Sequence, residues 1–111
     1  MSNLRIVVEN ESPVTRVALE GELDLSEADR LELELLKAER SAPPTLLIDL
    51  RDLTFIDSTG IRLVLEADAR ARRDARRLAL VRGPDEVHRV FLIALLDKRL
   101  EFVDEPPETE G

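Results

Sequence analysis

The sequence contains no cysteine, no tryptophan and no tyrosine, and only three phenylalanines. Without cysteine the chain can form no disulfide, thiolate nucleophile or cysteine metal site, and it fits a reducing compartment such as the cytoplasm. With so few aromatic rings the core must be aliphatic, and the stacking platforms used to bind nucleic-acid bases are missing. One histidine and scattered carboxylates offer no recognisable ligand set, so we expect no metal site and no cofactor.

Basic residues are outnumbered: 16 lysines and arginines stand against 24 aspartates and glutamates, which gives a net charge of −8. This balance disfavours binding to nucleic acid and to anionic lipid. The longest apolar run, residues 91–96, is far shorter than the roughly 18 residues of a spanning helix. Residues 1–8 also lack the apolar stretch of a secretory signal. We therefore expect a cytoplasmic protein without membrane insertion that binds other proteins.

The length and composition fit one globular domain. Of the 111 residues, 43% are apolar and 36% are charged. A domain of this length buries about two-thirds of its surface on folding, so it needs no disulfide or metal to stabilise its core. We place the domain at residues 1–103. The remaining residues 104–111, DEPPETEG, are acidic and contain two prolines, and we predict that they form a disordered tail.

The N-terminal segments have the patterns of a β-hairpin followed by a helix. Apolar residues alternate with others over residues 4–8 and again over 14–19, on either side of the turn Asn10–Pro13. We expect Gly21 to close the second strand. From Ser26 to Ala38 the apolar residues recur at helical spacing, and Ser26 is the predicted N-cap. Two prolines shortly after this segment end the helix.

The rest of the chain alternates strands and helices. Residues 45–50 form an almost continuous apolar strand, which we place in the centre of the sheet. A second helix, a short strand over residues 78–81, a third helix and a last short strand over 100–103 follow. In the third helix, Pro84 occupies the first position and an apolar stripe extends to Leu95. The predicted fold is an α/β domain in which an N-terminal hairpin leads into βα crossover units, with a small mixed sheet covered by helices.

Two hydroxyl groups stand where the central strand passes into the second helix, in the sequence Asp57-Ser58-Thr59-Gly60. Local structure alone can explain this pattern. Asp57 or Ser58 can cap the helix, and Gly60, which lacks a Cβ, can allow close approach of a neighbouring strand or of a partner.

The residues around this motif resemble a known family. Residues 47–60, LIDLRDLTFIDSTG, resemble the signature of the anti-sigma factor antagonists, the stand-alone STAS domains, in which D-S-[ST]-G opens a helix after a buried strand. Residues 21–26, GELDLS, resemble the family's turn between second strand and first helix, and the third helix from Gly83 is also similar. The resemblance covers residues 4–103 and implies the same fold as the element order above. Members commonly carry a glycine after the third helix, where this chain has Ala94-Leu95-Leu96-Asp97.

The resemblance implies a phosphorylation switch centred on Ser58. In the family this serine is phosphorylated by a partner that is both an anti-sigma factor and an ATP-dependent serine kinase, and a PP2C-type phosphatase restores the hydroxyl. The unmodified form binds that partner and frees a sigma factor. Thr59 is a second, less favoured acceptor. The implied partner-binding residues are Asp24, Ser26, Asp57, Ser58, Thr59, Gly60 and Ile61. Turn formation and helix capping are the alternative explanation for Asp24 and Ser26.

Two other functions stay open. A STAS domain can serve as a scaffold or transporter-accessory domain whose motif is not phosphorylated. A small serine hydrolase would use Ser58 as nucleophile, but it needs a base, and we expect the only histidine, His88, on the surface of the third helix. Asp49, Asp52 or Asp57 could suggest a phospho-acceptor aspartate as in response-regulator receivers. The chain lacks the acid pair after the first strand and the lysine after a later strand that such a site requires. We therefore predict that the protein is not an enzyme.

Residues 70–77 contain five arginines. In a chain this acidic we do not expect a nucleic-acid patch. The arginines are placed to complement the negative end of the second helix, and they can also attract an acidic protein surface.

Overall fold

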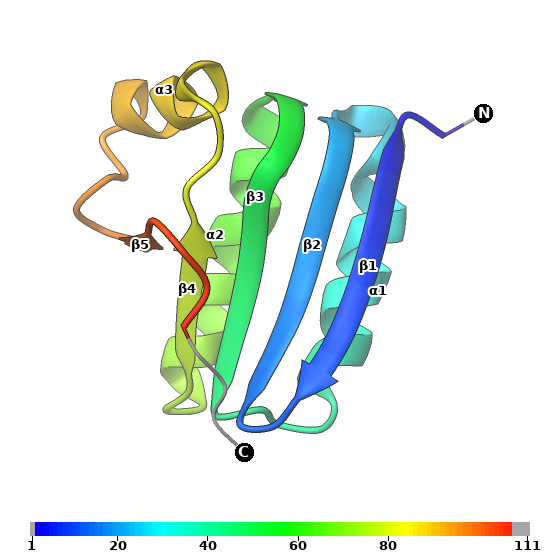
Figure 1. The fold of residues 1–111 in the computed structure, drawn as a ribbon, viewed down its shortest axis with the longest axis vertical. Coiled ribbons are helices and arrows are strands. Elements are labelled where there is room, and N and C mark those ends of the chain that lie inside the picture. The colour runs from blue at the N-terminus through cyan, green and yellow to red at the C-terminus, as the bar shows by residue number, and fades with distance from the viewer. Residues whose placement is uncertain (1, 108–111) are drawn as a thin grey trace.

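The computed structural model describes residues 2–107 and confirms the predicted α/β fold with its small mixed sheet. The strands are β1 (Leu4–Glu11), β2 (Val14–Leu23), β3 (Thr45–Ile56), β4 (Arg77–Val81) and β5 (Glu101–Val103), and the helices are α1 (Ala28–Glu39), α2 (Ser58–Arg73) and α3 (Asp85–Ile93), with a 3-10 turn η1 (Leu25–Glu27) before α1. The sheet order is β1-β2-β3-β4-β5, with β1 antiparallel to β2 and the other pairs parallel (Figure 1).

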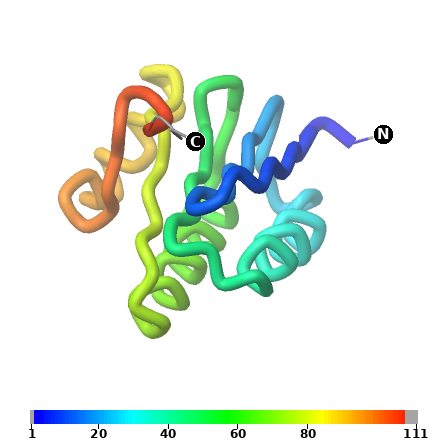
Figure 2. Tube along the Cα trace, turned by 60° about the horizontal axis from the view of Figure 1, so that its bottom comes forward, coloured from blue at the N-terminus to red at the C-terminus, as the bar shows by residue number. Residues whose placement is uncertain are grey.

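The main core lies between the sheet and the helices α1 and α2. Figures 1 and 2 show these two helices on the same side of the sheet, while α3 lies beyond the end of β4. Val17 and Leu19 of β2 and Ile48 and Leu50 of β3 are buried in this core. Leu47 of β3 is also buried, in a second apolar cluster that includes Ala79 and Val81 of β4. Burial on both faces explains the near-continuous apolar run and confirms the central position of β3.

Strands β2 and β3 are both longer than predicted. Gly21 does not end β2, which continues to Leu23. Gly21 has φ +104 and lies at an irregularity in the pairing of β2 with β3, so it lets the strand bend and resume. Strand β3 continues to Ile56, because Leu53 and Ile56 remain buried while the residues between them are exposed. The longer strands carry the chain to the end of the sheet where the predicted motif lies.

The helix termini correct two predicted caps. Ser26 does not cap α1; it lies in η1, whose N-cap Asp24 accepts a hydrogen bond from the backbone N–H of Ser26 at 3.0 Å. In α3, Pro84 is the N-cap residue and the helix begins one residue later. Each correction moves a boundary by one or two residues, because a short 3-10 turn or an extended proline precedes the helix.

The third helix is shorter than its predicted stripe. It ends at Ile93, and Leu95 lies beyond it with φ +60 and 82% of its surface exposed. Leu95 thus takes the left-handed conformation that glycine favours after a helix, at the place where the resemblance implies a glycine. The helix end keeps its usual geometry without the glycine, and its apolar stripe stops short of Leu95.

The predicted surface position of His88 is wrong. Its side chain is buried, 8% exposed, and its ring lies edge-on to Phe102 with 4.8 Å between centroids. Phe91 packs against the same Phe102 ring at 5.2 Å. His88 Nδ1 is buried and has no hydrogen-bond partner within residues 2–107. Phe102 of β5 thus packs against the face of α3 that carries His88 and Phe91, which helical periodicity alone does not reveal.

Burial of His88 gives a pH-dependent stability. Burial, aided by the nearby Arg82 charge, holds the pKa of His88 below its usual 6.5. The unfolded chain therefore binds a proton more readily, so the stabilising contribution is complete above about pH 6.5 and is lost as pH falls toward the folded pKa. We expect His88→Leu to flatten the free energy of unfolding measured in urea between about pH 5 and pH 7. If the free energy of unfolding of the variant changed as steeply with pH as that of the wild type, this pH dependence would belong to other groups.

The chain after β5 crosses the sheet face opposite α1 and α2 (Figure 1). The predicted tail starts at residue 104. In its described part, residues 104–107, Asp104 pairs with Arg82 at 3.4 Å, and Pro106 and Pro107 are half-buried. Residues 108–111 of the predicted tail lie outside the described residues. Among residues 2–107, no helix has the length and apolar character needed to cross a bilayer.

Candidate functional site

The two motifs found in the sequence meet at one end of the sheet. Leu23, the last residue of β2, is the register partner of Ile56, the last residue of β3. The backbone N–H of Asp57 donates to the carbonyl of Leu23 at 3.3 Å and ties the two strand ends together. Since β2 and β3 are parallel, Asp24 and Asp57 follow neighbouring strands at the same edge of the sheet. Asp24 therefore lies on a turn next to the D-S-T-G motif.

Each aspartate caps the helical turn that follows it. Asp57 is the N-cap of α2, and its Oδ1 accepts from the N–H groups of Thr59 at 3.0 Å and Gly60 at 3.2 Å. Asp24 caps η1, and the Ser26 hydroxyl also donates to its carboxylate. The capping role that local structure predicts is therefore real for both aspartates, and Ser26 serves the same turn.

Ser58 is the first residue of α2 and its side chain is exposed. Its hydroxyl forms no hydrogen bond within the described part of the chain. Thr59, the next residue, is half-buried. The first turn of α2 carries no acidic side chain, and the helix is 16 residues long. The hydroxyl of Ser58 is thus accessible at the positive end of a long helix dipole, where added negative charge is tolerated.

Gly60 and Ile61 lie beneath this surface. A Cβ on Gly60 would lie 2.7 Å from Ile56 Cγ1 and 2.9 Å from Leu23 Cδ2, so the first turn of α2 rests directly on the two strand ends. Ile61 is 7% exposed and belongs to the core. The inner side of α2 thus packs on the sheet and positions Ser58 from below, and direct partner contact of these two residues stays a prediction.

Two exposed apolar residues next to the motifs were missed from the sequence. Leu25, in η1, is 72% exposed, and Phe55, near the end of β3, is 47% exposed. Leu25 directly follows Asp24, and Phe55 is the register partner of Glu22 on the neighbouring strand. A signal was available for Leu25, which stands between the polar residues Asp24 and Ser26. Apolar side chains exposed beside an accessible hydroxyl are typical of an interaction surface.

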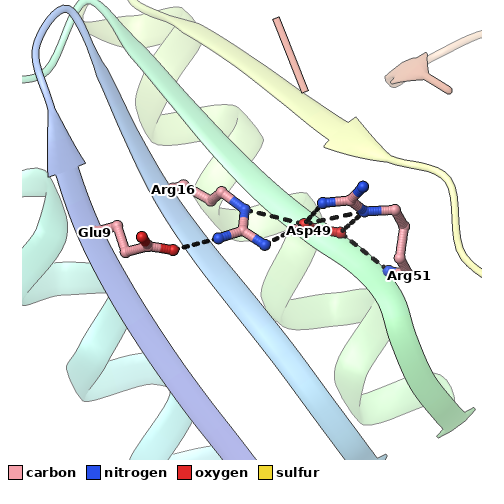
Figure 3. Close-up of polar contacts among 4 residues, drawn as sticks. All are labelled: Glu9, Arg16, Asp49 and Arg51. Carbon is pink, nitrogen blue, oxygen red and sulfur yellow. Dashed lines mark hydrogen bonds and ion pairs between the residues drawn. The ribbon is translucent and has the colours of Figure 1, made fainter. Parts of the chain in front are cut away.

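A buried carboxylate lies on the opposite face of the sheet, away from this site (Figure 3). Asp49, 3% exposed, accepts hydrogen bonds from Arg16 Nη2 and Arg51 Nη2, each at 2.7 Å. Arg16 also pairs with Glu9. Burial alone would raise the pKa of Asp49, but the hydrogen bonds from Arg51 and Arg16 outweigh it and hold the pKa below 3.8. Asp49 is a structural anion.

The described residues contain no cluster of three or more histidine and acidic side chains that could hold a metal ion. The chemistry of the site therefore reduces to an exposed serine hydroxyl, two capping carboxylates and two exposed apolar side chains. Such an arrangement suits binding to another protein and covalent modification of Ser58.

Known proteins similar to this chain include two curated relatives. An anti-sigma F factor antagonist of Paenibacillus polymyxa is 27% identical over 103 residues, which cover 92% of this chain and 88% of that protein. An anti-sigma-B factor antagonist of Staphylococcus aureus is 27% identical over 108 residues, or 97% of this chain and 99% of that protein.

Solved structures share the fold. The crystal structure of an anti-sigma factor antagonist from Mycobacterium paratuberculosis superimposes with a TM-score of 0.84 at 23% identity, over 92% of this chain and 86% of that one. SpoIIAA in its unphosphorylated form gives a TM-score of 0.78 at 24% identity, over 91% of this chain and 90% of that one. The family model described as "Mlab, STAS domain" matches residues 6–104. The chain therefore belongs to the STAS domain family.

Proposed function

We propose that this protein is an anti-sigma factor antagonist whose binding to an anti-sigma factor is switched off by phosphorylation of Ser58. The observation that carries the proposal is the exposed Ser58 hydroxyl at the start of α2, beside the capped turn of Asp24. Two relatives that match over 92% and 97% of this chain are anti-sigma factor antagonists, which supports the same class of partner. A structural neighbour, SpoIIAA, is known in unphosphorylated and phosphorylated forms.

Electrostatics explain how one phosphate can act as a switch. A phosphoserine carries about −1.5 to −2 charges at pH 7. At Ser58 this charge would join the carboxylates of Asp24 and Asp57 on a surface that a partner must cover. The helix dipole and the N-terminal N–H groups stabilise the phosphate within the domain itself. Phosphorylation is therefore expected to weaken partner binding while the fold persists.

The proposed partners follow from this switch. One is an anti-sigma factor with serine kinase activity, and the other is a PP2C-type phosphatase that removes the phosphate. The protein itself acts by binding and has no catalytic role in this scheme. The buried ring of His88, packed against Phe91 and Phe102, argues against a hydrolase that uses Ser58 and His88 together.

The test compares the wild type with Ser58→Ala and Ser58→Asp. We expect Ser58→Ala to bind the anti-sigma factor as the wild type does, and Ser58→Asp to bind at least about tenfold more weakly, since two adjacent carboxylates are already present. Isothermal titration calorimetry gives the affinities.

Mass spectrometry after incubation with ATP and a candidate anti-sigma kinase encoded nearby locates the phosphate. We expect the phosphate on Ser58 of the wild type and no phosphate on Ser58→Ala.

Thr59→Ala is the matched control, because it removes the neighbouring hydroxyl and leaves Ser58 in place. It should be phosphorylated normally. Equal affinities for all three Ser58 forms would contradict the switch. No phosphate in the presence of a demonstrably active kinase would instead favour a STAS scaffold or transporter-accessory role without phosphorylation.

A further inference from the structure

A basic hollow of about 300 Å³ lies away from Ser58, between the last turns of α2, the start of β4 and the segment that leads into β5. Five cationic side chains line it: Arg72, Arg76, Arg77, Lys98 and Arg99. Only two acidic residues, Asp68 and Glu101, line it as well. This local excess of positive charge is opposite in sign to the net charge of −8 of the whole chain. A concave site of this volume lies at the small end of the range for ligand sites.

Both acidic residues of the hollow are already paired. Arg72 Nε contacts Asp68 Oδ2 at 2.9 Å, and Arg77 Nε contacts Glu101 Oε1 at 2.9 Å. Lys98 and Arg99 are exposed and form no ion pair within residues 2–107. The pairs inside the hollow therefore leave the charges of Lys98 and Arg99 available for a ligand.

Arg76 supplies an independent observation. Its side chain is only 9% exposed, yet its Nη1 atom has no hydrogen-bond acceptor in the described chain. Its Nη2 atom lies 3.1 Å from Asp74 and 3.9 Å from Glu39. Glu39 is already held by Arg70 at 2.7 Å and 2.9 Å, so it is shared between two arginines. A buried guanidinium with an unpaired donor is unusual and points to a further acceptor.

We propose that this hollow binds a small phosphate-bearing anion through Arg76, Lys98 and Arg99. The planar donors of arginine match phosphate oxygens in pairs, and lysine adds a mobile point charge. Buried Leu78 and Leu100 form the apolar part of the wall and strengthen the electrostatic attraction. No aromatic side chain lines the hollow, so it offers no surface on which a nucleobase can stack. The ligand is therefore recognised by its phosphate and not by a base.

The site connects three parts of the fold. Arg76 lies between α2 and β4, whereas Lys98 and Arg99 precede β5 on the other side of the hollow. Arg72 Nη2 already bridges these parts by donating to the carbonyl of Arg99 at 2.7 Å. An anion bound among these cations adds a second bridge and relieves their mutual repulsion. Bound ligand is thus expected to stabilise the folded state.

The experiment titrates the full chain with inorganic pyrophosphate at constant ionic strength, followed by calorimetry and by the thermal unfolding midpoint. We expect saturable binding to the wild type and at least about tenfold weaker binding to the Lys98→Ala/Arg99→Ala variant. Both residues are exposed, so the variant should fold. The matched control is Arg5→Ala/Arg89→Ala, which removes two exposed positive charges outside the hollow. Its affinity should remain within about twofold of wild type.

Three outcomes would overturn the proposal. One is the absence of saturable binding up to millimolar pyrophosphate. Another is equal weakening in the two double variants, which would assign the effect to overall charge. The third is equal binding of citrate, or binding of an acidic peptide in place of pyrophosphate, which would replace a phosphate-bearing ligand with a carboxylate ligand. Tighter binding of pyrophosphate than of citrate, lost only in Lys98→Ala/Arg99→Ala, supports it.

Discussion

Replacing Gly21 with alanine is expected to lower the free energy of unfolding by about 3 kcal/mol. Gly21 has φ +104, a conformation that an L side chain rarely adopts. An added Cβ would also lie 2.1 Å from the backbone oxygen of Asn3. That oxygen accepts the N–H of Glu22 at 2.9 Å, so relief of the clash would break this hydrogen bond and displace the start of β1. Backbone strain and steric clash therefore add at this position.

Urea unfolding of the variant measures this loss. Glu20→Ala is the matched control, because Glu20 is exposed and precedes Gly21 in the same strand. It should change the free energy of unfolding by no more than about 0.5 kcal/mol. A Gly21→Ala variant that loses less than about 1 kcal/mol would mean that β1 shifts without cost and that the close approach at Asn3 does not constrain the fold.

Gly21 also shows why the sequence predicted the order of elements better than their ends. Periodicity identified the hairpin, the central strand and all three helices, since their apolar faces are built from local repeats. Glycine is normally a signal for a turn, and nothing local indicates that β2 passes through it and pairs for two more residues. Gly21 has its positive φ at an irregularity in the pairing of β2 with β3, and β3 lies more than 20 residues further along the chain.

The candidate site was predicted in part for the same reason. The N-cap Asp57 and the exposed Ser58 follow from a local motif, and both lie where the sequence placed them. Burial of Ile61 follows from how α2 rests on the strand ends, which depends on tertiary packing. Exposure of Phe55 likewise depends on how the ends of β2 and β3 meet, whereas the polar neighbours of Leu25 already indicate its exposure.

Ion pairs between distant segments were beyond sequence reasoning. The arginine-rich segment was expected to complement the end of α2, and three of its arginines do lie in the last turn of that helix. Its members also pair with particular carboxylates. Arg70 binds Glu39 of α1, and Arg77 binds Glu101 of β5. These partners are separated by 31 and 24 positions in the chain, so no helical spacing reveals them. Within residues 70–77, only Arg72 pairs at the i, i+4 distance that a sequence pattern can indicate.

Asp49 provides the second large effect, because it is a buried anion that two arginines share. We expect Asp49→Ala to lower the free energy of unfolding at pH 7 by about 2–3 kcal/mol. The variant would leave Arg16 and Arg51 facing each other without their acceptor. This loss of stability should be smaller than the loss on breaking a fully buried ion pair. The side chains of Arg16 and Arg51 are 29% and 44% exposed, so water partly screens their charges.

The same carboxylate should give the wild type an acid-sensitive stability that the variant lacks. The pKa of Asp49 lies below 3.8 in the folded state, so the unfolded chain binds the proton more readily. Its contribution is complete above about pH 4 and is lost as pH falls through the folded pKa. The difference in the free energy of unfolding between wild type and Asp49→Ala, measured in urea, should therefore shrink from pH 7 to about pH 3.

Asp52→Ala, at an exposed position of the same strand, should leave stability nearly unchanged at both pH values. A constant difference for Asp49→Ala across this range would mean that it reflects lost packing, and that the charge on Asp49 contributes little.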